Sequence, residues 1–251
     1  MKTHVLNCAT IRPYLLPIDI ATCCLLVELE DGLLLVDTGL GTKDHECPSS
    51  GIRLFRRLTR LFCPPEQTAL NQVIGLGFTA EDVQHIVMTH LHIDHAGGIS
   101  DFPEATVHVS ETEYMIAQSG GKLRGLVYIA DHWAHGPNWQ LYRQSEANNW
   151  FGFNTIRVLS RSTIQVLLVP LPGHTREHCG VAVGDGKRWI LHCGDAIALG
   201  ALKTKPDSIM ARPLGPNFPM LHGLAQSQEG IVKLIPSHVL LDEVPVMNGA
   251  G

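Results

Sequence analysis

Two short apolar runs separated by a turn stand near the N-terminus of the chain. Residues 23–30 and 33–37 are mainly apolar, and Asp31-Gly32 between them is a dipeptide typical of tight β-turns. The second run closes on Asp37-Thr38-Gly39. The pattern therefore predicts a β-hairpin whose two strands are buried.

Helical and strand-like periods alternate over the next part of the chain. Apolar residues recur at near-helical spacing in residues 52–62, with arginines between them, which predicts a basic amphipathic helix. Thr79 and the acidic residues after it are typical of a helix N-terminus, so we expect a short helix over residues 79–85 and a buried strand over 86–88. The pattern also predicts a strand at residues 106–109 and a helix at 111–118.

Residues 119–155 have little periodicity and are rich in glycine, asparagine, histidine and tryptophan. A segment of this length without regular structure is usually either a functional lid or disordered, and the aromatic residues favour an irregular, lid-like insertion. Two interpretations of its aromatic side chains stay open, because they either wall a substrate pocket or pack the lid itself. These residues are Trp133, Trp139, Trp150, Phe151 and Phe153.

Strand-like runs return in the second half of the chain, at residues 156–159, 164–170, 180–183 and 189–193. Two groups of strands followed by helical segments favour an α/β fold, an αββα sandwich of two mixed β-sheets packed face to face with helices outside. No linker-like stretch divides the chain, so we expect a single domain over residues 1–251.

The charge balance and the cysteines narrow the class of protein. The 251 residues include 19 Lys and Arg against 24 Asp and Glu, a formal charge of −5, which argues against an extended basic face for nucleic acid or anionic lipid. No apolar run approaches the ~20 residues of a membrane helix, and no secretory signal is visible. Seven cysteines without a C-x-x-C pair favour free thiols and a cytoplasmic location.

The densest group of chemically active residues follows the predicted strand at 86–88. Three histidines and an aspartate stand within six residues there, and a polar turn without function rarely has this composition. Imidazole and carboxylate are the ligands that hold Zn²⁺ and related ions. Further candidates follow the ends of later apolar runs, and together with the first group they can complete two coordination shells. They lie in Gly173-His174-Thr175, His192-Cys193-Gly194-Asp195 and Ser237-His238.

The ordered motifs resemble those of the metallo-β-lactamase superfamily of metal-dependent hydrolases. They are His90-Leu91-His92-Ile93-Asp94-His95, Gly173-His174-Thr175, Gly194-Asp195 and Ser237-His238, and the run ending in Asp37-Thr38-Gly39 also looks like that family. The resemblance covers residues from about 20 to 240 and implies the αββα fold of that family.

The resemblance also implies a ligand set and a mechanism. His90, His92 and His174 would hold one divalent metal ion, Asp94, His95 and His238 a second, and Asp195 would bridge them. Zinc is the expected metal, with manganese or iron as alternatives. A hydroxide shared by the two ions would attack a carbonyl, and Asp94 would be the catalytic residue that orients it and moves its proton. Near these ligands, Asp37, Thr89, Thr175 and His178 either orient imidazoles or pack structurally.

Several substrate classes remain open, because substrate choice resides in loops added to the fold. N-acyl homoserine lactonases are similar in length and metal set, but they carry a tyrosine where this chain has Ala198. Tyr114, Tyr128, Tyr142 or a histidine of the lid could replace it. Thioester hydrolysis of the glyoxalase II type and β-lactam hydrolysis are alternatives. A non-catalytic metal-bound scaffold and a homodimer formed through the Leu54–Phe62 part of the predicted helix are also considered. The expected partner is a small-molecule substrate, and neither nucleic acid nor a membrane is expected.

Overall fold

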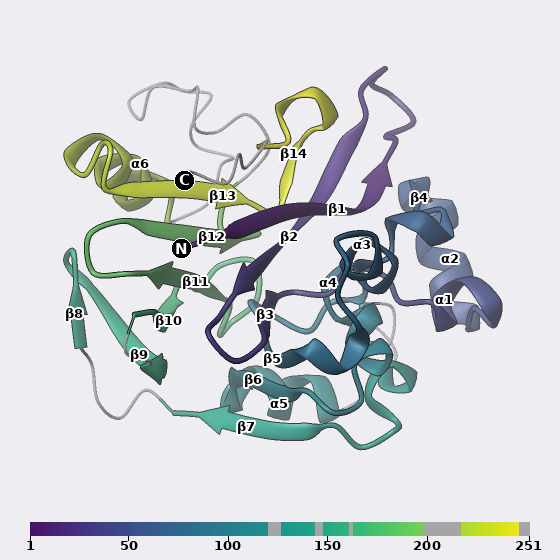
Figure 1. Cartoon of the computed structure of the whole chain (residues 1–251). Coiled ribbons are helices and arrows are strands. Elements are labelled where there is room, and N and C mark those ends of the chain that lie inside the picture. The colour runs from purple at the N-terminus through teal and green to yellow at the C-terminus, as the bar shows by residue number, and fades with distance from the viewer. Residues whose placement is uncertain (120–126, 144–147, 161–162, 198–216, 246–251) are drawn as a thin grey trace.

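Two β-sheets pack face to face in the computed structural model, which describes residues 1–119, 127–143, 148–160, 163–197 and 217–245 (Figure 1). The first sheet has the order β4-β1-β2-β3-β5-β6-β7, with β14 paired to β2. Its strands are β1 (Thr3–Ile11), β2 (Ile20–Glu28), β3 (Leu33–Val36), β4 (Leu61–Phe62), β5 (Val83–Val87), β6 (Thr106–Ser110), β7 (Asn138–Tyr142) and β14 (His238–Leu240).

The second sheet has the order β13-β12-β11-β10-β9-β8. Both sheets are mixed, because β3, β5, β6 and β7 pair in parallel within the first and β12 pairs in parallel with β13 within the second. The strands of the second sheet are β8 (Asn148–Trp150), β9 (Phe153–Ser160), β10 (Gln165–Pro170), β11 (Cys179–Gly184), β12 (Trp189–Gly194) and β13 (Val232–Pro236).

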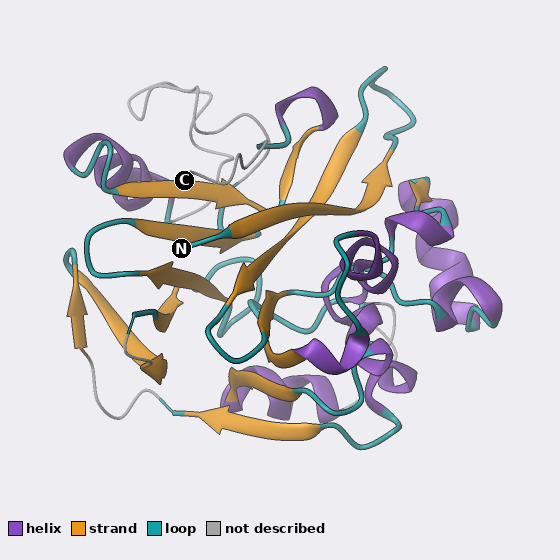
Figure 2. Cartoon of the chain, viewed as in Figure 1, coloured by secondary structure: helices purple, strands orange, loops and turns teal. Residues whose placement is uncertain are grey.

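Helices cover the outer faces of both sheets (Figure 2). The α-helices are α1 (Lys43–Glu46), α2 (Ser50–Thr59), α3 (Ala69–Gly75), α4 (Ile93–Ala96), α5 (Glu111–Gln118) and α6 (Phe218–Ser227). Short 3-10 helices are η1 (Pro65–Gln67), η2 (Ala80–Asp82), η3 (Gly97–Asp101), η5 (Ala130–Trp133) and η8 (Leu241–Glu243). Only α6 among these helices packs in the core of the second sheet, whereas α3 and α5 pack in that of the first.

Alternation along the central strands explains the layers. In β3, Leu34 and Val36 point into the core between the sheets, and Leu33 and Leu35 point into the core beneath the helices. Successive side chains of a strand face opposite sides, so a strand that is apolar at every position is buried on both. The predicted αββα sandwich of two mixed sheets is therefore confirmed.

The predicted hairpin and the strand-like runs of the second half are present as strands, but the predicted helix over residues 79–85 is wrong. Helical structure ends after the three residues of η2, and β5 begins at Val83. The Asp82 side chain caps the backbone of Thr79, so the helix-start signal was real. From Val83 on, backbone pairing of β5 with β3 on one side and β6 on the other keeps the chain in a strand.

Regular structure also occurs in the segment that we expected to be irregular. Within the described part of residues 119–155, β7 extends the first sheet in parallel with β6, and β8 pairs with β9 at the edge of the second. Edge strands have only one neighbour and need little apolar periodicity, so their sequences resemble loops.

The aromatic residues of this segment pack into the cores rather than around a shared pocket. Trp133 and Trp139 join the core beneath the first sheet, and Trp150 and Phe153 join that outside the second. Trp150 contacts Trp189, the first residue of β12. Phe151 is exposed. The packing interpretation therefore holds for these four side chains.

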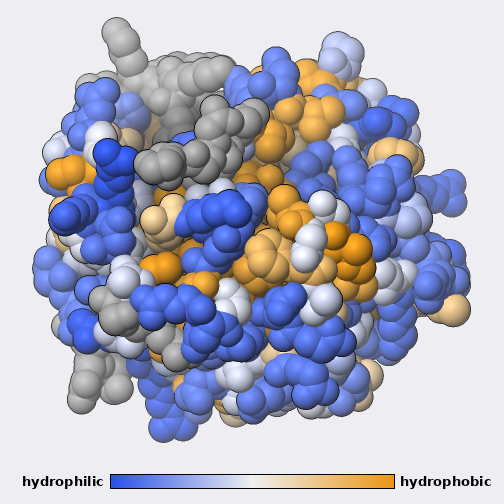
Figure 3. Space-filling view, in the orientation of Figure 1, coloured by the Kyte–Doolittle hydropathy of each residue, from blue (hydrophilic) through white to orange (hydrophobic). Residues whose placement is uncertain are grey.

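The cysteines and the surface have the character that the sequence predicts, with free thiols and a mainly polar exterior (Figure 3). All seven cysteines are free, and Cys47 alone is exposed. The view in Figure 3 is mainly hydrophilic, with apolar residues gathered near its centre. Within the described ranges, no helix combines the length and the apolar character needed to cross a bilayer.

The core between the sheets should dominate the stability of the fold. Leu168 on β10 is fully buried there, whereas Leu58 on α2 is 64% exposed. We expect Leu168→Ala to lower the free energy of unfolding by about 2–5 kcal/mol and Leu58→Ala by less than about 0.5 kcal/mol. Urea unfolding of both variants checks this, and equal losses would contradict the packing described.

Candidate metal centre

The first four predicted ligands follow β5 at the carboxyl end of the strand. His90 and His92 lie in the loop after it, and His92 is the N-cap residue of α4. Asp94 and His95 are in that single helical turn. Because the chain changes from a loop to a helical turn here, His90 and His92 can face one ligand position while Asp94 and His95 face another.

The other three ligands come from the second half of the chain. His174 lies in the loop after β10, Asp195 follows β12 directly, and His238 begins β14 after β13. These strand ends meet the end of β5 at one edge of the sandwich. Residues far apart in sequence are thereby brought into one cluster.

The seven side chains form three overlapping groups. Within each group the ligand atoms all lie within 4.8 Å of one another. The groups are His90 with His92 and His174, His90 with His95 and Asp195, and Asp94 with His95 and His238. The structure therefore brings together every residue that the sequence placed in the ligand set.

Asp195 lies between the two outer groups. Its Oδ2 atom is 3.3 Å from Nε2 of His174, and its Oδ1 atom is 3.3 Å from Nε2 of His95 and 3.4 Å from Nε2 of His238. One oxygen thus faces each group, which is the arrangement that a bridging carboxylate requires.

Unpartnered buried atoms provide a direct test of whether these residues fit metal ions. Nε2 of His90 is buried and makes no hydrogen bond, and Nε2 of His95 and Oδ1 of Asp195 are buried and lie 3.3 Å apart without the geometry of a hydrogen bond. Buried polar atoms are rarely left without a partner unless an ion or another group satisfies them. The donor set, five imidazoles and two carboxylates, is also one that suits Zn²⁺ and its neighbours, so the residues fit divalent ions.

The protonation states of His90 and His92 suit ligation. Burial, with the neighbouring His95 and His92 rings, lowers the pKa of His90 well below its usual value. Burial and the neighbouring His174 ring lower the pKa of His92 to about 3. Both rings are therefore neutral near pH 7, which is the form that binds a metal.

Asp37 orients two of the ligand rings. It accepts hydrogen bonds from Nδ1 of His95 at 2.8 Å and from the Thr89 hydroxyl at 2.7 Å, and the Thr89 oxygen is 3.0 Å from Nδ1 of His90. Both rings therefore have Nδ1 occupied and Nε2 free for a metal. Burial favours the neutral acid, but the His95 ring, His192 and the Thr89 N–H together outweigh it and lower the pKa of Asp37.

The His178 ring holds the backbone of Asp195. It does not orient another imidazole, which was one of the two roles considered from the sequence. Its Nε2 atom accepts a hydrogen bond from the Asp195 N–H at 3.0 Å, and Nδ1 donates to the Leu171 carbonyl at 3.2 Å. Gly194 permits this approach, since a Cβ there would lie 2.3 Å from Nε2 of His178. Its φ of +54° also favours glycine.

Thr175 likewise contacts no imidazole through its hydroxyl, which donates to the buried carboxylate of Glu113 at 2.8 Å. The sequence predicts a helix around Glu113 but no function for its side chain. Nothing in the sequence distinguishes it from Glu111 on the same helix, which is at the surface and pairs with Arg143. Only the fold identifies the carboxylate that lies beside the ligand loops.

Two of the three tyrosines considered as replacements for the lactonase tyrosine have hydroxyls that are bound to other side chains. Tyr128 contacts the His92 ring but donates its hydroxyl to Glu113, and the Tyr142 hydroxyl is 2.9 Å from Nδ1 of His108. Tyr114 packs edge-on against Trp139. Ala198 lies outside the described residues.

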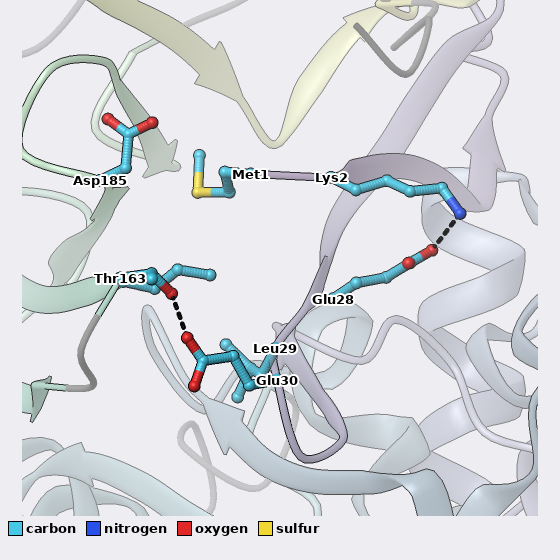
Figure 4. Close-up of a pocket in the computed structure, with 8 residues that line it drawn as sticks. Met1, Lys2, Glu28, Leu29, Glu30, Thr163 and Asp185 are labelled. Carbon is cyan, nitrogen blue, oxygen red and sulfur yellow. Dashed lines mark hydrogen bonds and ion pairs between the residues drawn. The ribbon is translucent and has the colours of Figure 1, made fainter. Parts of the chain in front are cut away.

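An open pocket of about 410 Å³ lies at the opposite end of the strands (Figure 4). Glu28 and Glu30 flank its β2 side, and Asp185 lies at the turn that precedes β12. Lys2 pairs with Glu28, and Thr163 donates to Glu30. The pocket is therefore separate from the histidine cluster.

Comparisons with known proteins place the chain in a large group of enzymes. A family model described as the metallo-beta-lactamase superfamily matches residues 19–238. The probable metallo-hydrolase Rv2300c of Mycobacterium tuberculosis is 45% identical over 199 residues, which are 78% of this chain and 62% of that protein. The chain thus spans less than two thirds of that relative. An N-acyl homoserine lactonase of a Bacillus species is 31% identical over 109 residues, 40% of this chain and 41% of that protein.

Solved structures extend the likeness to the fold. An N-acyl homoserine lactone hydrolase with the product N-hexanoyl-L-homoserine at its catalytic metal centre superposes with a TM-score of 0.68 at 18% identity, over 96% of this chain and 94% of that one. AidC, a dizinc quorum-quenching lactonase, has a TM-score of 0.58 at 19% identity, over 88% and 74% of the two chains. Because the sequence identities are only 18% and 19%, these two structures show a shared fold and no more.

The contact between Gly194 and His178 should control the position of Asp195. We expect Gly194→Ala to weaken zinc affinity by about tenfold or more, because the new methyl group displaces His178 or Asp195. Gly186→Ala is the matched control, since Gly186 also has a positive φ, +84°, but its Cβ would meet nothing within 4 Å. Zinc competition with a chelator measures both, and equal affinities would contradict the proposed constraint.

Proposed function

The chain belongs to the metallo-beta-lactamase superfamily, and from this premise we propose that it is a dinuclear metal-dependent hydrolase of small lactones or esters. One observation supports the proposal most strongly. Seven imidazole and carboxylate side chains converge in three groups at one edge of the sandwich, with buried ligand atoms that have no other partner. Structural zinc sites are usually closed four-ligand cages, and this larger, shared cluster suits catalysis better.

We propose that His90, His92 and His174 hold one ion and that Asp94, His95 and His238 hold the other, with Asp195 between them. Zinc is the metal that we expect, and manganese or iron would suit the same ligands. When bound, such ions supply Lewis acidity, which lowers the pKa of water and polarises a carbonyl oxygen.

Asp94 is our candidate for proton transfer. Its carboxylate is buried at the cluster, with Oδ2 3.6 Å from Nε2 of His238 and Oδ1 3.9 Å from Nε2 of His95. A carboxylate there can accept the proton of the attacking water and return it to the leaving oxygen. Asp37 and His178 are positioning residues, because they hold the His95 ring and the backbone of Asp195 in place.

The substrate class that we propose is an N-acyl homoserine lactone or a related small ester. Proteins with that activity appear among both the sequence relatives and the structural neighbours. Ala198 stands in place of the lactonase tyrosine, and the hydroxyls of Tyr128 and Tyr142 have other partners, so this chain would stabilise the substrate carbonyl without a phenol at residue 198.

We also propose a cytoplasmic location. Seven free cysteines, of which six are buried, suit a reducing compartment.

Lactone opening by the metal-loaded protein tests the proposed function. We expect proton release from a long-chain N-acyl homoserine lactone, and a loss of about 10²–10⁴-fold in kcat for Asp94→Ala, because the variant lacks both a ligand and the proton acceptor. Asp185→Ala, at the opposite end of the strands, is the control and should retain full activity. Turnover that survives in Asp94→Ala would contradict the role of Asp94, and no turnover by the native protein would contradict the lactone substrate.

A further inference from the structure

A buried carboxylate joins the two loops that carry the first group of ligands. Glu113 on α5 is fully buried and accepts three hydrogen bonds. They come from the backbone N–H of Leu91 at 3.1 Å, the hydroxyl of Tyr128 at 3.0 Å and the hydroxyl of Thr175 at 2.8 Å. All three donors are neutral, so the contacts serve geometry rather than charge neutralisation.

Each donor is next to a ligand of one particular ion. Leu91 stands between His90 and His92 in the chain, and Thr175 follows His174. The Tyr128 ring packs edge-on against His92 with the ring centres 4.8 Å apart. Glu113 therefore contacts the immediate supports of His90, His92 and His174.

The ligands of the other ion are held by different residues. His95 is held by Asp37 at its ring and by Thr38, whose hydroxyl donates to the His95 carbonyl at 2.8 Å. His238 is positioned by backbone pairing of β14 with β2, opposite Thr22. The described contacts of Glu113 include none of these residues.

We propose that Glu113 is a positioning residue that sets the affinity of the ion held by His90, His92 and His174 and leaves the other ion unaffected. The inference rests on the proposed dinuclear site. Glu113 touches neither ion nor substrate, and it acts by fixing the distance between the loop after β5 and the loop after β10.

Glu113→Gln separates this role from simple packing. The substitution keeps the volume of the side chain, but the amide nitrogen cannot accept a hydrogen bond, so either Thr175 or the Leu91 and Tyr128 pair loses its acceptor. Loss of such an outer contact typically weakens metal affinity by about 10–100-fold. A residue with only a structural role would lower the melting temperature and leave the metal affinity of the folded protein unchanged.

Two ligand variants make the effect specific to one ion. His238→Ala removes a ligand of the second ion, so the remaining tight site is that of the first group. His174→Ala does the reverse. We would measure zinc affinity and stoichiometry by competition with a chromophoric chelator, for the native chain and both variants, each with and without Glu113→Gln. Glu111→Gln, on the exposed face of the same helix, is the matched control.

The expected result is a fall of about 10–100-fold in zinc affinity in the His238→Ala background and no change in the His174→Ala background. An equal fall in both backgrounds, or none in either, would overturn the proposed role of Glu113. If the native chain binds fewer than two zinc ions, the proposed dinuclear site is wrong, and the proposed role of Glu113 is then wrong as well. Two bound zinc ions with unchanged affinity in Glu113→Gln would contradict the role of Glu113 alone.

Thr175→Val provides a second route if Glu113→Gln does not fold. It removes one donor and retains the shape of the side chain, so it should lower the same zinc affinity in the His238→Ala background by a smaller factor. Unchanged affinity in a folded Thr175→Val protein would contradict the proposed link between the two loops.

Discussion

The hydrogen bonds of the Asp37 carboxylate join the first sheet to the ligands that depend on it. Asp37 is fully buried at the end of β3 and adopts a φ of +55°, which Asp tolerates better than most residues other than glycine. It accepts hydrogen bonds from the backbone and side chain of Thr89 and from the ring of His95. One carboxylate thereby fixes the end of β5, the tautomer of His95 and, through Thr89, the orientation of His90.

The two residues after Asp37 serve the same turn. Thr38 holds the His95 carbonyl and accepts a hydrogen bond from the Gly98 N–H. Gly39 has a φ of +65°, and a Cβ there would lie 2.3 Å from Cβ of Cys8.

The second sheet is held against this edge by His192, whose Nε2 atom is 2.9 Å from the Cys23 carbonyl of β2. Asp195, three residues after His192, consequently lies where it faces both groups of ligands.

The sequence was sufficient to predict those parts of the structure that depend on local pattern or on dense motifs. The apolar run in residues 33–37 and the run of His and Asp after residue 89 predicted a buried strand and a ligand loop, and the structure has both. Edge strands β7 and β8 were missed, because a strand with one neighbour carries a weak pattern. Glu113 was missed for a different reason, since its burial depends on loops that the chain reaches 62 residues later, at Thr175.

The claim on which the account depends is that the seven converging side chains hold two separate ions. Anomalous diffraction at the zinc absorption edge, from crystals of the zinc-loaded protein, tests this most directly. The account predicts two peaks, one coordinated by His90, His92 and His174 and the other by Asp94, His95 and His238, with Asp195 in contact with both. A single peak, or peaks away from these residues, would contradict it.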